Sequence, residues 1–298
     1  MRIGVIGLGN IGGAIAANLV ADGHAVVVHD ADPDRARPLV EAGARSLGGP
    51  AEVARAAEIT FASLPSPEAV RAVADAWLRG AAPESIFVDL STNSPRAVQD
   101  LGERLAAAGC HLLEAPLTGG APGAQARMLV FLVAGDEPVY ARCKPILEKL
   151  GRATFHLGEL GRGNVAKLVN SLLAFTCAWV SLEGLTLAAA AGIDLRTMVE
   201  IVRTGGASNF FMDRLVEGIN QRQRPPQFAL ELAAKDARLI VDTALQLGVP
   251  SPVAGQIAQV FVAAVRAGLG KRDWSDIVEF AERQADVKLE LAPPREAG

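Results

Sequence analysis

Short apolar runs alternate with helical patterns over the first half of the chain. The apolar runs cover residues 3–6, 25–28, 59–64, 86–90, 111–114, 129–133 and 154–157. Between them apolar residues recur at helical spacing, and Pro33, Pro67 and Pro95 mark helix starts. Strands that alternate with helices in this way predict an α/β fold with a doubly wound parallel sheet. Pro145 should bend or delay the helix before the last run.

The pattern changes after about Gly163, where the strand-like runs stop. One long apolar helix is predicted from about Asn164 to Ala191, and Gly192 should end it. At about 1.5 Å per residue this helix is about 40 Å long, which suits a connection between two domains. We therefore expect a Rossmann-type domain over residues 1–162, followed by an all-α domain over residues 163–298 that begins with this interdomain helix.

The first strand leads directly into Gly7-Leu8-Gly9-Asn10-Ile11-Gly12, and a helical pattern follows from Ala14 to Ala21. Strand, glycine turn and helix is the order that a dinucleotide site requires. The first glycine allows a tight turn, the second lets a pyrophosphate approach the backbone, and the third lets the helix pack on the strand. Asp30 ends the second strand about twenty residues later, where an acidic side chain contacts the adenosine ribose.

Lys167 is the main candidate for acid–base chemistry. It lies near the start of the long apolar helix, and Asn170 and Ser171 follow it on the same face one turn later. A lysine at such a position either extends to solvent or serves a polar pocket. Burial would lower its pKa from about 10.4, as an acid–base lysine needs. The three polar groups on one face favour the pocket.

Two further segments follow strands. In the segment from Glu114 to Gly123, Gly119-Gly120 can expose consecutive backbone N–H groups to an anion, although such a segment taken alone is more often an ordinary loop. Asp89-Leu90-Ser91-Thr92 lies at the carboxyl end of a strand, the edge at which open α/β sheets bind ligands. Ser94, just beyond it, is expected to be a helix N-cap and nothing more.

Charge and composition exclude several functions. The net charge is −4 and no long basic run is present, so nucleic acid and anionic membranes are not expected as partners. The apolar stretch from Leu168 to Ala191 is long enough to span a membrane, but it contains Glu183 and several other polar residues. A buried core helix is the better interpretation, and such an apolar helical domain should form a homodimer or homotetramer.

The cysteines and histidines indicate neither disulfides nor a metal. The three cysteines are far apart and odd in number, which is typical of free thiols in a reducing compartment. We expect no signal peptide, because the glycine turn begins at Gly7, and therefore a cytoplasmic protein. The four histidines show no metal-ligand spacing, and no serine elbow or P-loop lysine is found, so no metal is expected.

Together these motifs resemble the β-hydroxyacid dehydrogenase family, which includes 3-hydroxyisobutyrate dehydrogenase, tartronate semialdehyde reductase and, more distantly, 6-phosphogluconate dehydrogenase. The resemblance covers nearly the whole chain, and its motifs occur in the right order. Besides the glycine turn, the matching segments are Ala17-Asn18-Leu19, Asp89-Leu90-Ser91-Thr92, Ala115-Pro116-Leu117-Thr118-Gly119-Gly120, Gly161-x-Gly163 with Lys167 and Asn170, and Phe228 with Lys235-Asp236.

The resemblance implies hydride transfer between NAD and the hydroxyl-bearing carbon of a small β-hydroxyacid, or reduction of the matching semialdehyde. Lys167 would be the general acid/base, and Thr118-Gly119-Gly120 would hold the substrate carboxylate. Asn170, Ser171 and Phe228 would also contact the substrate. The family usually has Asn at the position of Ser171 and Ser at that of Thr118, which leaves the identity of the carboxylate substrate open.

The resemblance also assigns cofactor contacts. Leu64, Pro65 and Thr92 would line the nicotinamide side, and Lys235 would close over the cofactor. The carboxylate of Asp30 would accept bonds from the ribose hydroxyls and repel a 2′-phosphate, which favours NAD over NADP. Relatives that prefer NADP usually carry Arg immediately after this position, where this chain has Ala31, and Arg35 should lie on the following helix.

Three other functions stay open at this point. An imine reductase has the same architecture, but such relatives usually replace the lysine and prefer NADPH, so Lys167 and Asp30 favour the dehydrogenase. A decarboxylating enzyme of the 6-phosphogluconate type should have more basic residues near its site. A non-catalytic NAD-binding module would bind the cofactor without turnover.

Overall fold

The computed structural model describes residues 1–291. The chain divides into two compact units, Met1–Leu168 and Val169–Gly298. Their boundary falls inside the long helix α8, Arg162–Ala190, whereas the sequence predicts a boundary between residues 162 and 163, at the start of that helix. The reason is that the first turns of α8 pack on strands of the first unit.

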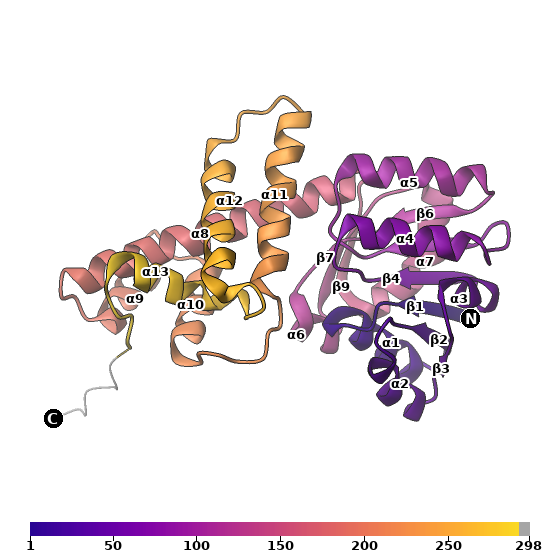
Figure 1. Cartoon of the computed structure of the whole chain (residues 1–298), viewed down its shortest axis with the longest axis horizontal. Helices are drawn as coiled ribbons and strands as arrows, with labels where there is room; N and C mark the ends of the chain where they lie inside the picture. The colour runs from indigo at the N-terminus through magenta and orange to yellow at the C-terminus, as the bar shows by residue number, and fades with distance from the viewer. Residues whose placement is uncertain (292–298) are drawn as a thin grey trace. The chain divides into compact units, whose positions relative to one another are not determined.

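Six parallel strands form the main sheet of the first unit, in the order β3-β2-β1-β4-β5-β6 (Figure 1). They are β1 Arg2–Ile6, β2 Ala25–His29, β3 Arg45–Ser46, β4 Ile59–Ala62, β5 Ile86–Asp89 and β6 His111–Glu114. The strand order reverses at β1, which pairs with both β2 and β4. Sheets of this kind bind ligands outside the carboxyl ends of the strands at that point. The predicted doubly wound parallel sheet is confirmed.

Helices cover both faces of this sheet, with one apolar core on each face. The helices between its strands are α1 Asn10–Ala21, the 3-10 turn η1 Pro33–Ala36, α2 Arg37–Glu41, α3 Pro50–Ala56, α4 Pro67–Leu78 and α5 Pro95–Ala107. One core includes Leu19 of α1, and the other includes Trp77 of α4. The indole N–H of Trp77 donates to the hydroxyl of Thr60 at 3.0 Å, so burial of this side chain leaves its polar atom satisfied.

A smaller sheet follows, in the order β7-β8-β9. Its elements are β7 Leu117–Thr118, α6 Gly120–Gln125, β8 Leu129–Val133, α7 Glu137–Leu150 and β9 Gly151–His156. β7 pairs antiparallel with β8, which corrects the expectation of a single parallel sheet. Helix α7 begins before Pro145 and continues through it, so the proline does not delay the helix. Burial of neighbours such as Cys143 and Leu147 outweighs the lost hydrogen bond.

The described part of the second unit is helical, as predicted (Figure 1). After α8 come α9 Leu195–Thr204, α10 Phe210–Asn220, α11 Leu230–Gln246, α12 Pro252–Ala264, the π turn η2 Val265–Leu269, the 3-10 turn η3 Trp274–Asp276 and α13 Ile277–Ala285. Helices α11 and α12 pack side by side. The sequence predicts fraying of the tail at Pro293-Pro294-Arg295, which lies outside the described residues.

Gly192 ends helix α8 as the sequence predicts. Its φ is +76°, a conformation that favours glycine. The N–H of Gly192 donates to the carbonyl of Ala189 at 2.9 Å, and that of Ile193 to Ala188 at 2.9 Å. These two bonds form a Schellman motif, which satisfies carbonyls that the helix end would otherwise leave without donors.

Within residues 1–291, two helices are long and apolar enough to cross a membrane: α8, and the stretch Pro252–Leu269. In their most apolar windows 44% and 33% of the residues are buried within the folded chain. A core helix of a folded protein passes the same test. The finding is therefore weak support for a membrane protein.

Candidate active site

The glycine turn between β1 and α1 has no room for side chains at two of its positions. Gly7 has a φ of +85°, and a Cβ there would lie 2.2 Å from the carbonyl oxygen of Ser63. A Cβ at Gly12 would lie 1.9 Å from the carbonyl oxygen of Gly7. At Gly9, by contrast, the nearest neighbour is the Arg35 guanidinium at 3.4 Å. The backbone at Gly9 is thus open to a ligand, as a pyrophosphate would require.

Asp30 directly follows β2 and holds the glycine turn through its carboxylate. One of its carboxylate oxygens accepts a hydrogen bond from the N–H of Leu8 at 2.6 Å, and the other from Asp32 at 2.8 Å. Arg35, expected on the following helix, lies on η1 and extends its guanidinium toward Gly9, while its Nε is 3.5 Å from Asp32. Sequence reasoning assigned Asp30 only to the ribose and missed its bond to Leu8.

Helix α1 begins at Asn10 without a side-chain cap, because its N-cap residue is Gly9. A helix start leaves backbone N–H groups without partners in its own ladder, and its dipole places partial positive charge there. The turn therefore fits a pyrophosphate. Glycines occupy the two positions at which a Cβ would clash with the backbone, and the start of the helix offers N–H donors. Leu8, Asn10 and Ile11 contribute backbone to this same turn.

The segments after β4 and β5 are tied together. The N–H of Leu64 donates to the hydroxyl of Ser91 at 3.0 Å, and the N–H of Ser91 donates to the carboxylate of Asp89 at 2.9 Å. Ser91 and Asp89 are buried, while Leu64 and Thr92 are half-buried. This pairing fixes Leu64-Pro65 beside Thr92 at the carboxyl edge of the sheet. Ser94 caps α5 by accepting a bond from Ala97 at 3.1 Å, as the sequence predicts.

The segment after β6 forms a tight glycine loop. Thr118 ends β7 and is half-buried, whereas Gly119 and Gly120 are exposed. These two glycines have φ values of +118° and +62°, a pair of conformations that side chains rarely adopt. The loop can therefore turn its backbone N–H groups outward, as a carboxylate site would need.

Helix α6, which follows this loop, is fastened to α1. The side-chain amide of Asn18 donates to the carbonyl of Ala124 at 2.9 Å. The guanidinium of Arg127 donates to the carboxylate of Asp22 at 2.8 Å and to the carbonyl of Asn18 at 3.1 Å. Asn18, which belongs to the cofactor signature by resemblance, thus contacts the substrate-loop helix. No local pattern in the sequence could have shown this.

Lys167 lies in the second turn of α8 and is half-buried within the first unit. Asn170 and Ser171 follow on the same helix, in the second unit; Asn170 is exposed and Ser171 is buried. The first unit therefore carries Lys167 together with the glycine turn, Asp30 and Thr118-Gly119-Gly120.

Sequence reasoning gave no role to Glu114, the last residue of β6, which is fully buried. Its carboxylate accepts hydrogen bonds from the backbone N–H groups of Gly161, Gly163 and Asn164, the latter two at 3.0 Å. The side-chain amide of Asn164 adds a fourth at 2.6 Å, and its oxygen accepts one from the N–H of Asn93 at 2.7 Å. Burial raises the pKa of Glu114 to about 7, against the opposing effect of these hydrogen bonds.

In the second unit, Asp273 holds the segment that carries Phe228. The N–H of Phe228 donates to Asp273 at 3.4 Å, and its carbonyl accepts from Trp274 at 2.8 Å. Burial raises the pKa of Asp273, but hydrogen bonds hold it below its ordinary value. Lys235 forms an ion pair of 2.9 Å with the buried Asp236. Phe228 and Lys235 thus belong to the unit that does not contain the glycine turn.

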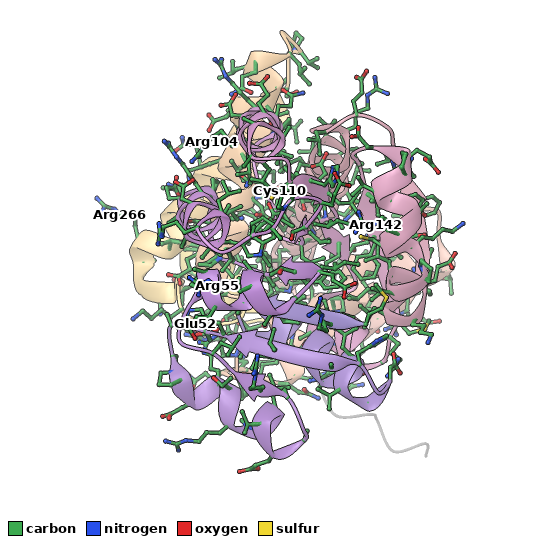
Figure 2. All side chains as sticks on the ribbon, turned by 90° about the vertical axis from the view of Figure 1, so that its right-hand side faces the viewer. Glu52, Arg55, Arg104, Cys110, Arg142 and Arg266 are labelled. Carbon is green, nitrogen blue, oxygen red and sulfur yellow. The ribbon has the colours of Figure 1, made fainter. Side chains whose placement is uncertain are left out.

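No cluster of three potential metal ligands occurs within residues 1–291. The three cysteines are free thiols. Cys110 lies inside the first unit, away from rim side chains such as Arg104 and Arg142 (Figure 2), and burial raises the pKa of its thiol. Burial likewise raises the pKa of Cys143 to about 12, so these two thiols are poor nucleophiles.

Two family models match the chain. The NAD binding domain of 6-phosphogluconate dehydrogenase matches residues 2–158, more than half of the chain. The NAD-binding region of NADP-dependent 3-hydroxyisobutyrate dehydrogenase matches residues 161–281. NAD(P)-binding domains are therefore present, and the two matches divide near the start of α8.

Known proteins are similar over nearly the whole chain. 2-(Hydroxymethyl)glutarate dehydrogenase from Eubacterium barkeri is 30% identical over 294 residues, which cover 97% of each chain. The cytokine-like nuclear factor N-PAC from Pongo abelii is 31% identical over 279 residues, covering 93% of this chain and 50% of that protein. The chain thus spans about half the length of its N-PAC relatives.

Solved structures of known proteins are also similar to this chain. The 3-hydroxyisobutyrate dehydrogenase of Mycobacterium tuberculosis, determined with L-serine, has a TM-score of 0.86 at 27% identity, covering 94% of this chain and 98% of that one. An imine reductase from Pseudomonas sp. has a TM-score of 0.62 at 18% identity, a likeness that shows the fold alone. By its family matches and its full-length relatives, the chain belongs to the β-hydroxyacid dehydrogenases, a family of NAD(P)-dependent enzymes.

Proposed function

We propose that the protein transfers a hydride between NAD and the hydroxyl-bearing carbon of a small β-hydroxyacid, or reduces the matching semialdehyde. The observation that carries this proposal is the position of Lys167. It lies in the second turn of a helix whose N-terminus is hydrogen-bonded to Glu114, and Glu114 begins the segment that leads to the glycine loop at Gly119-Gly120. An amine and an anion-binding loop are the groups that this reaction needs.

Each residue has a role in this proposal. Bound NAD supplies the hydride acceptor. The amine of Lys167 takes the hydroxyl proton during oxidation and returns it during reduction. Thr118-Gly119-Gly120 binds the substrate carboxylate, and Asn170, Ser171 and Phe228 complete the substrate contacts. Leu64-Pro65 and Thr92 support the nicotinamide side, and Lys235 closes over the cofactor.

The test is turnover of a panel of β-hydroxyacids and semialdehydes, followed by the absorbance of the reduced nicotinamide with NAD and with NADP. Turnover of at least one β-hydroxyacid or its semialdehyde, lost in Lys167→Ala, is the expected result. Cyclic imines belong in the panel, because reduction of an imine with NADPH in preference to every hydroxyacid pair would replace this proposal. Binding of NAD without turnover across the panel would indicate a non-catalytic module.

Asp30 should determine the preference for NAD. Asp30→Ala removes the acceptor for two ribose hydroxyls and the negative charge that repels a 2′-phosphate, so KM for NAD should rise by roughly 10- to 100-fold. The ratio of kcat/KM for NADP to that for NAD should rise with it. Steady-state kinetics with both cofactors measure this. Asp34→Ala, at an exposed acidic residue of η1, is the matched control and should change neither value.

We also propose a homodimer formed through α8. Four apolar side chains, Val169, Leu173, Val180 and Leu187, recur along this helix at spacings of four and seven residues and are more than half exposed. Such a stripe on one helix face is typical of a surface that another helix covers. A second copy of the chain is the partner that symmetric oligomers supply.

Leu187→Asp should convert this dimer to a monomer. Leu187 is 73% exposed, so the substitution costs the folded chain little, whereas a dimer would bury its charge. Sedimentation velocity at micromolar concentration measures the change in mass. Leu245→Asp, at an equally exposed leucine on α11, serves as control and should stay dimeric. A wild-type protein that sediments as a monomer would contradict the proposal.

We place this reaction in the cytoplasm. The free thiols Cys110, Cys143 and Cys177 support a reducing compartment, because an oxidising one favours disulfides. Oxidant-free purification from the cytosolic fraction of the source cells tests this, and recovery mainly from a membrane or organelle fraction would refute it.

A further inference from the structure

Glu114 is a fully buried acidic residue that has no part in the proposed chemistry. A carboxylate in an apolar interior is costly unless its oxygens accept several hydrogen bonds. Glu114 accepts four, all from Gly161, Gly163 and Asn164 at the start of α8. The helix dipole adds a favourable interaction with negative charge at this end. The carboxylate therefore attaches the N-terminus of α8 to the end of β6.

Three functional segments meet at this attachment. Glu114 itself lies four residues before Thr118 on the substrate segment. Asn164 lies three residues before Lys167 on α8, and its side-chain amide donates to Glu114 at 2.6 Å. The oxygen of the same amide accepts from the N–H of Asn93, the residue after Thr92, at 2.7 Å. One carboxylate and one amide thus link the substrate, acid–base and nicotinamide segments.

The attachment leaves little room for adjustment. A Cβ at Gly163 would lie 2.5 Å from the carbonyl oxygen of Leu132 and 3.0 Å from the carboxyl carbon of Glu114. The N–H of Leu132 in turn donates to the carbonyl of Pro116 at 2.9 Å. The first turn of α8 therefore rests on β8, which pairs with the start of the substrate segment. A shift of this turn would move Lys167 relative to Thr118.

We propose that the Glu114–Asn164 pair is a positioning device, which fixes Lys167 relative to the nicotinamide side at Thr92 and the substrate loop at Thr118-Gly119-Gly120. This inference rests on the proposed function, in which Lys167 exchanges the hydroxyl proton. A proton transfer requires the two heavy atoms within hydrogen-bond reach, so a displacement of about 1 Å lowers the rate steeply.

Glu114→Gln tests the pair. Glutamine has an NH₂ group in place of one of the two carboxylate oxygens, and each oxygen of Glu114 accepts two hydrogen bonds. The NH₂ group cannot accept from the two N–H groups that it would face, so two of the four hydrogen bonds between residue 114 and the start of α8 are lost. We expect kcat to fall at least tenfold, while the Kd of NAD, which the distant glycine turn determines, changes by less than threefold. Glu282→Gln is the matched control: Glu282 is a buried carboxylate of the second unit that accepts from the N–H of Leu289 at 2.7 Å. Glu282→Gln should lower the unfolding temperature without lowering kcat.

A second readout needs no substrate. Trace acetylation of Lys167, measured by peptide mass spectrometry at pH 8 relative to the exposed Lys144, reports the environment of the amine. Glu114→Gln weakens the hydrogen bonds that hold the first turn of α8, one turn before Lys167, so the surroundings of the amine and with them the labelling ratio should change at least threefold in either direction. If Glu114→Gln does not fold, Asn164→Ala is measured in its place. It removes the side-chain hydrogen bonds of Asn164 to Glu114 and Asn93, while the carboxylate and the backbone N–H of residue 164 remain, and a labelling ratio changed at least threefold in either direction is then expected.

The pH dependence of stability gives a third readout. The pKa of Glu114 is raised to about 7, so its protonated form favours folding, and this contribution is lost as pH rises from below 4.5 through 7. The unfolding temperature of the wild type should therefore fall relative to Glu114→Gln between pH 5 and pH 8. Asp89 on β5 is the register partner of Glu114, and both proteins retain it.

The outcomes separate this inference from the proposed function. A folded Glu114→Gln protein with wild-type kcat and a wild-type labelling ratio would overturn the positioning role. If Lys167→Ala keeps normal turnover, the proposed function fails. In that case the labelling ratio alone tests whether Glu114 positions the amine of Lys167, and an unchanged ratio would refute the positioning role.

Discussion

Lys167→Ala should lower kcat by a factor of about 10² to 10⁴, the usual contribution of a positioned acid–base group. Without the amine, no described side chain on the first turns of α8 can exchange a proton with the substrate hydroxyl, since Asn164 and Asn170 are amides. The Kd of NAD should change by less than about threefold, because the glycine turn and Asp30 follow β1 and β2 and do not belong to α8. Steady-state kinetics and calorimetric titration of NAD measure the two effects.

Lys167→Arg separates proton transfer from charge. Arginine keeps the positive charge and the donors but does not release a proton at neutral pH, so kcat should fall as far as in Lys167→Ala. Lys144→Ala, at an exposed lysine of α7, is the control and should retain wild-type kcat. Near-normal turnover in a folded Lys167→Ala protein would show that the acid–base assignment is wrong.

Gly12→Ala should abolish useful cofactor binding. Its Cβ would lie 1.9 Å from the carbonyl oxygen of Gly7, and neither atom can rotate away because both are fixed to the backbone. The helix must therefore shift from the strand, at a cost of about 3 kcal/mol in the free energy of unfolding. The N–H groups at the start of α1 shift with it, so the Kd of NAD should rise at least about 100-fold.

Calorimetric titration of NAD and thermal unfolding measure these two effects. The control is a glycine at which a Cβ would meet no neighbouring atom. A Cβ at Gly255, within α12, would meet nothing within 4 Å, so Gly255→Ala should leave NAD binding unchanged and stabilise the protein by up to about 1 kcal/mol. Binding by Gly12→Ala within threefold of the wild type would mean that the turn is not the cofactor site.

Local sequence patterns were sufficient to predict much of this fold. The glycine turn, the strand–helix alternation and the end of α8 at Gly192 each depend on residues close together in sequence, so their spacing carries the information. The two-residue strand β7 is too short to have a period, and its antiparallel pairing with β8 was therefore not predictable. Of the two effects predicted for Pro145, the delay of the helix does not occur, because burial against the sheet outweighs a local preference.

The contacts that organise the candidate site are the least predictable. Glu114 meets Gly161 and Asn164 across about fifty residues, and Asn18 meets Ala124 across more than a hundred. A buried Glu at a strand end has no distinguishing neighbours in the sequence. What could have drawn attention to it is its place immediately before Ala115-Pro116, at the start of the substrate signature.

The fastening of α1 by Asn18, Ala124 and Arg127 limits how this protein can be recombined with others. A chimera that exchanges the first ninety residues for those of a relative would replace Asn18 and Asp22, which here contact Ala124 of α6 and Arg127 just after it. The Gly119-Gly120 loop would then rest on a foreign helix. Engineers who wish to change the cofactor while keeping the substrate should therefore transfer residues through Arg127 as one block, or alter Asp30 alone.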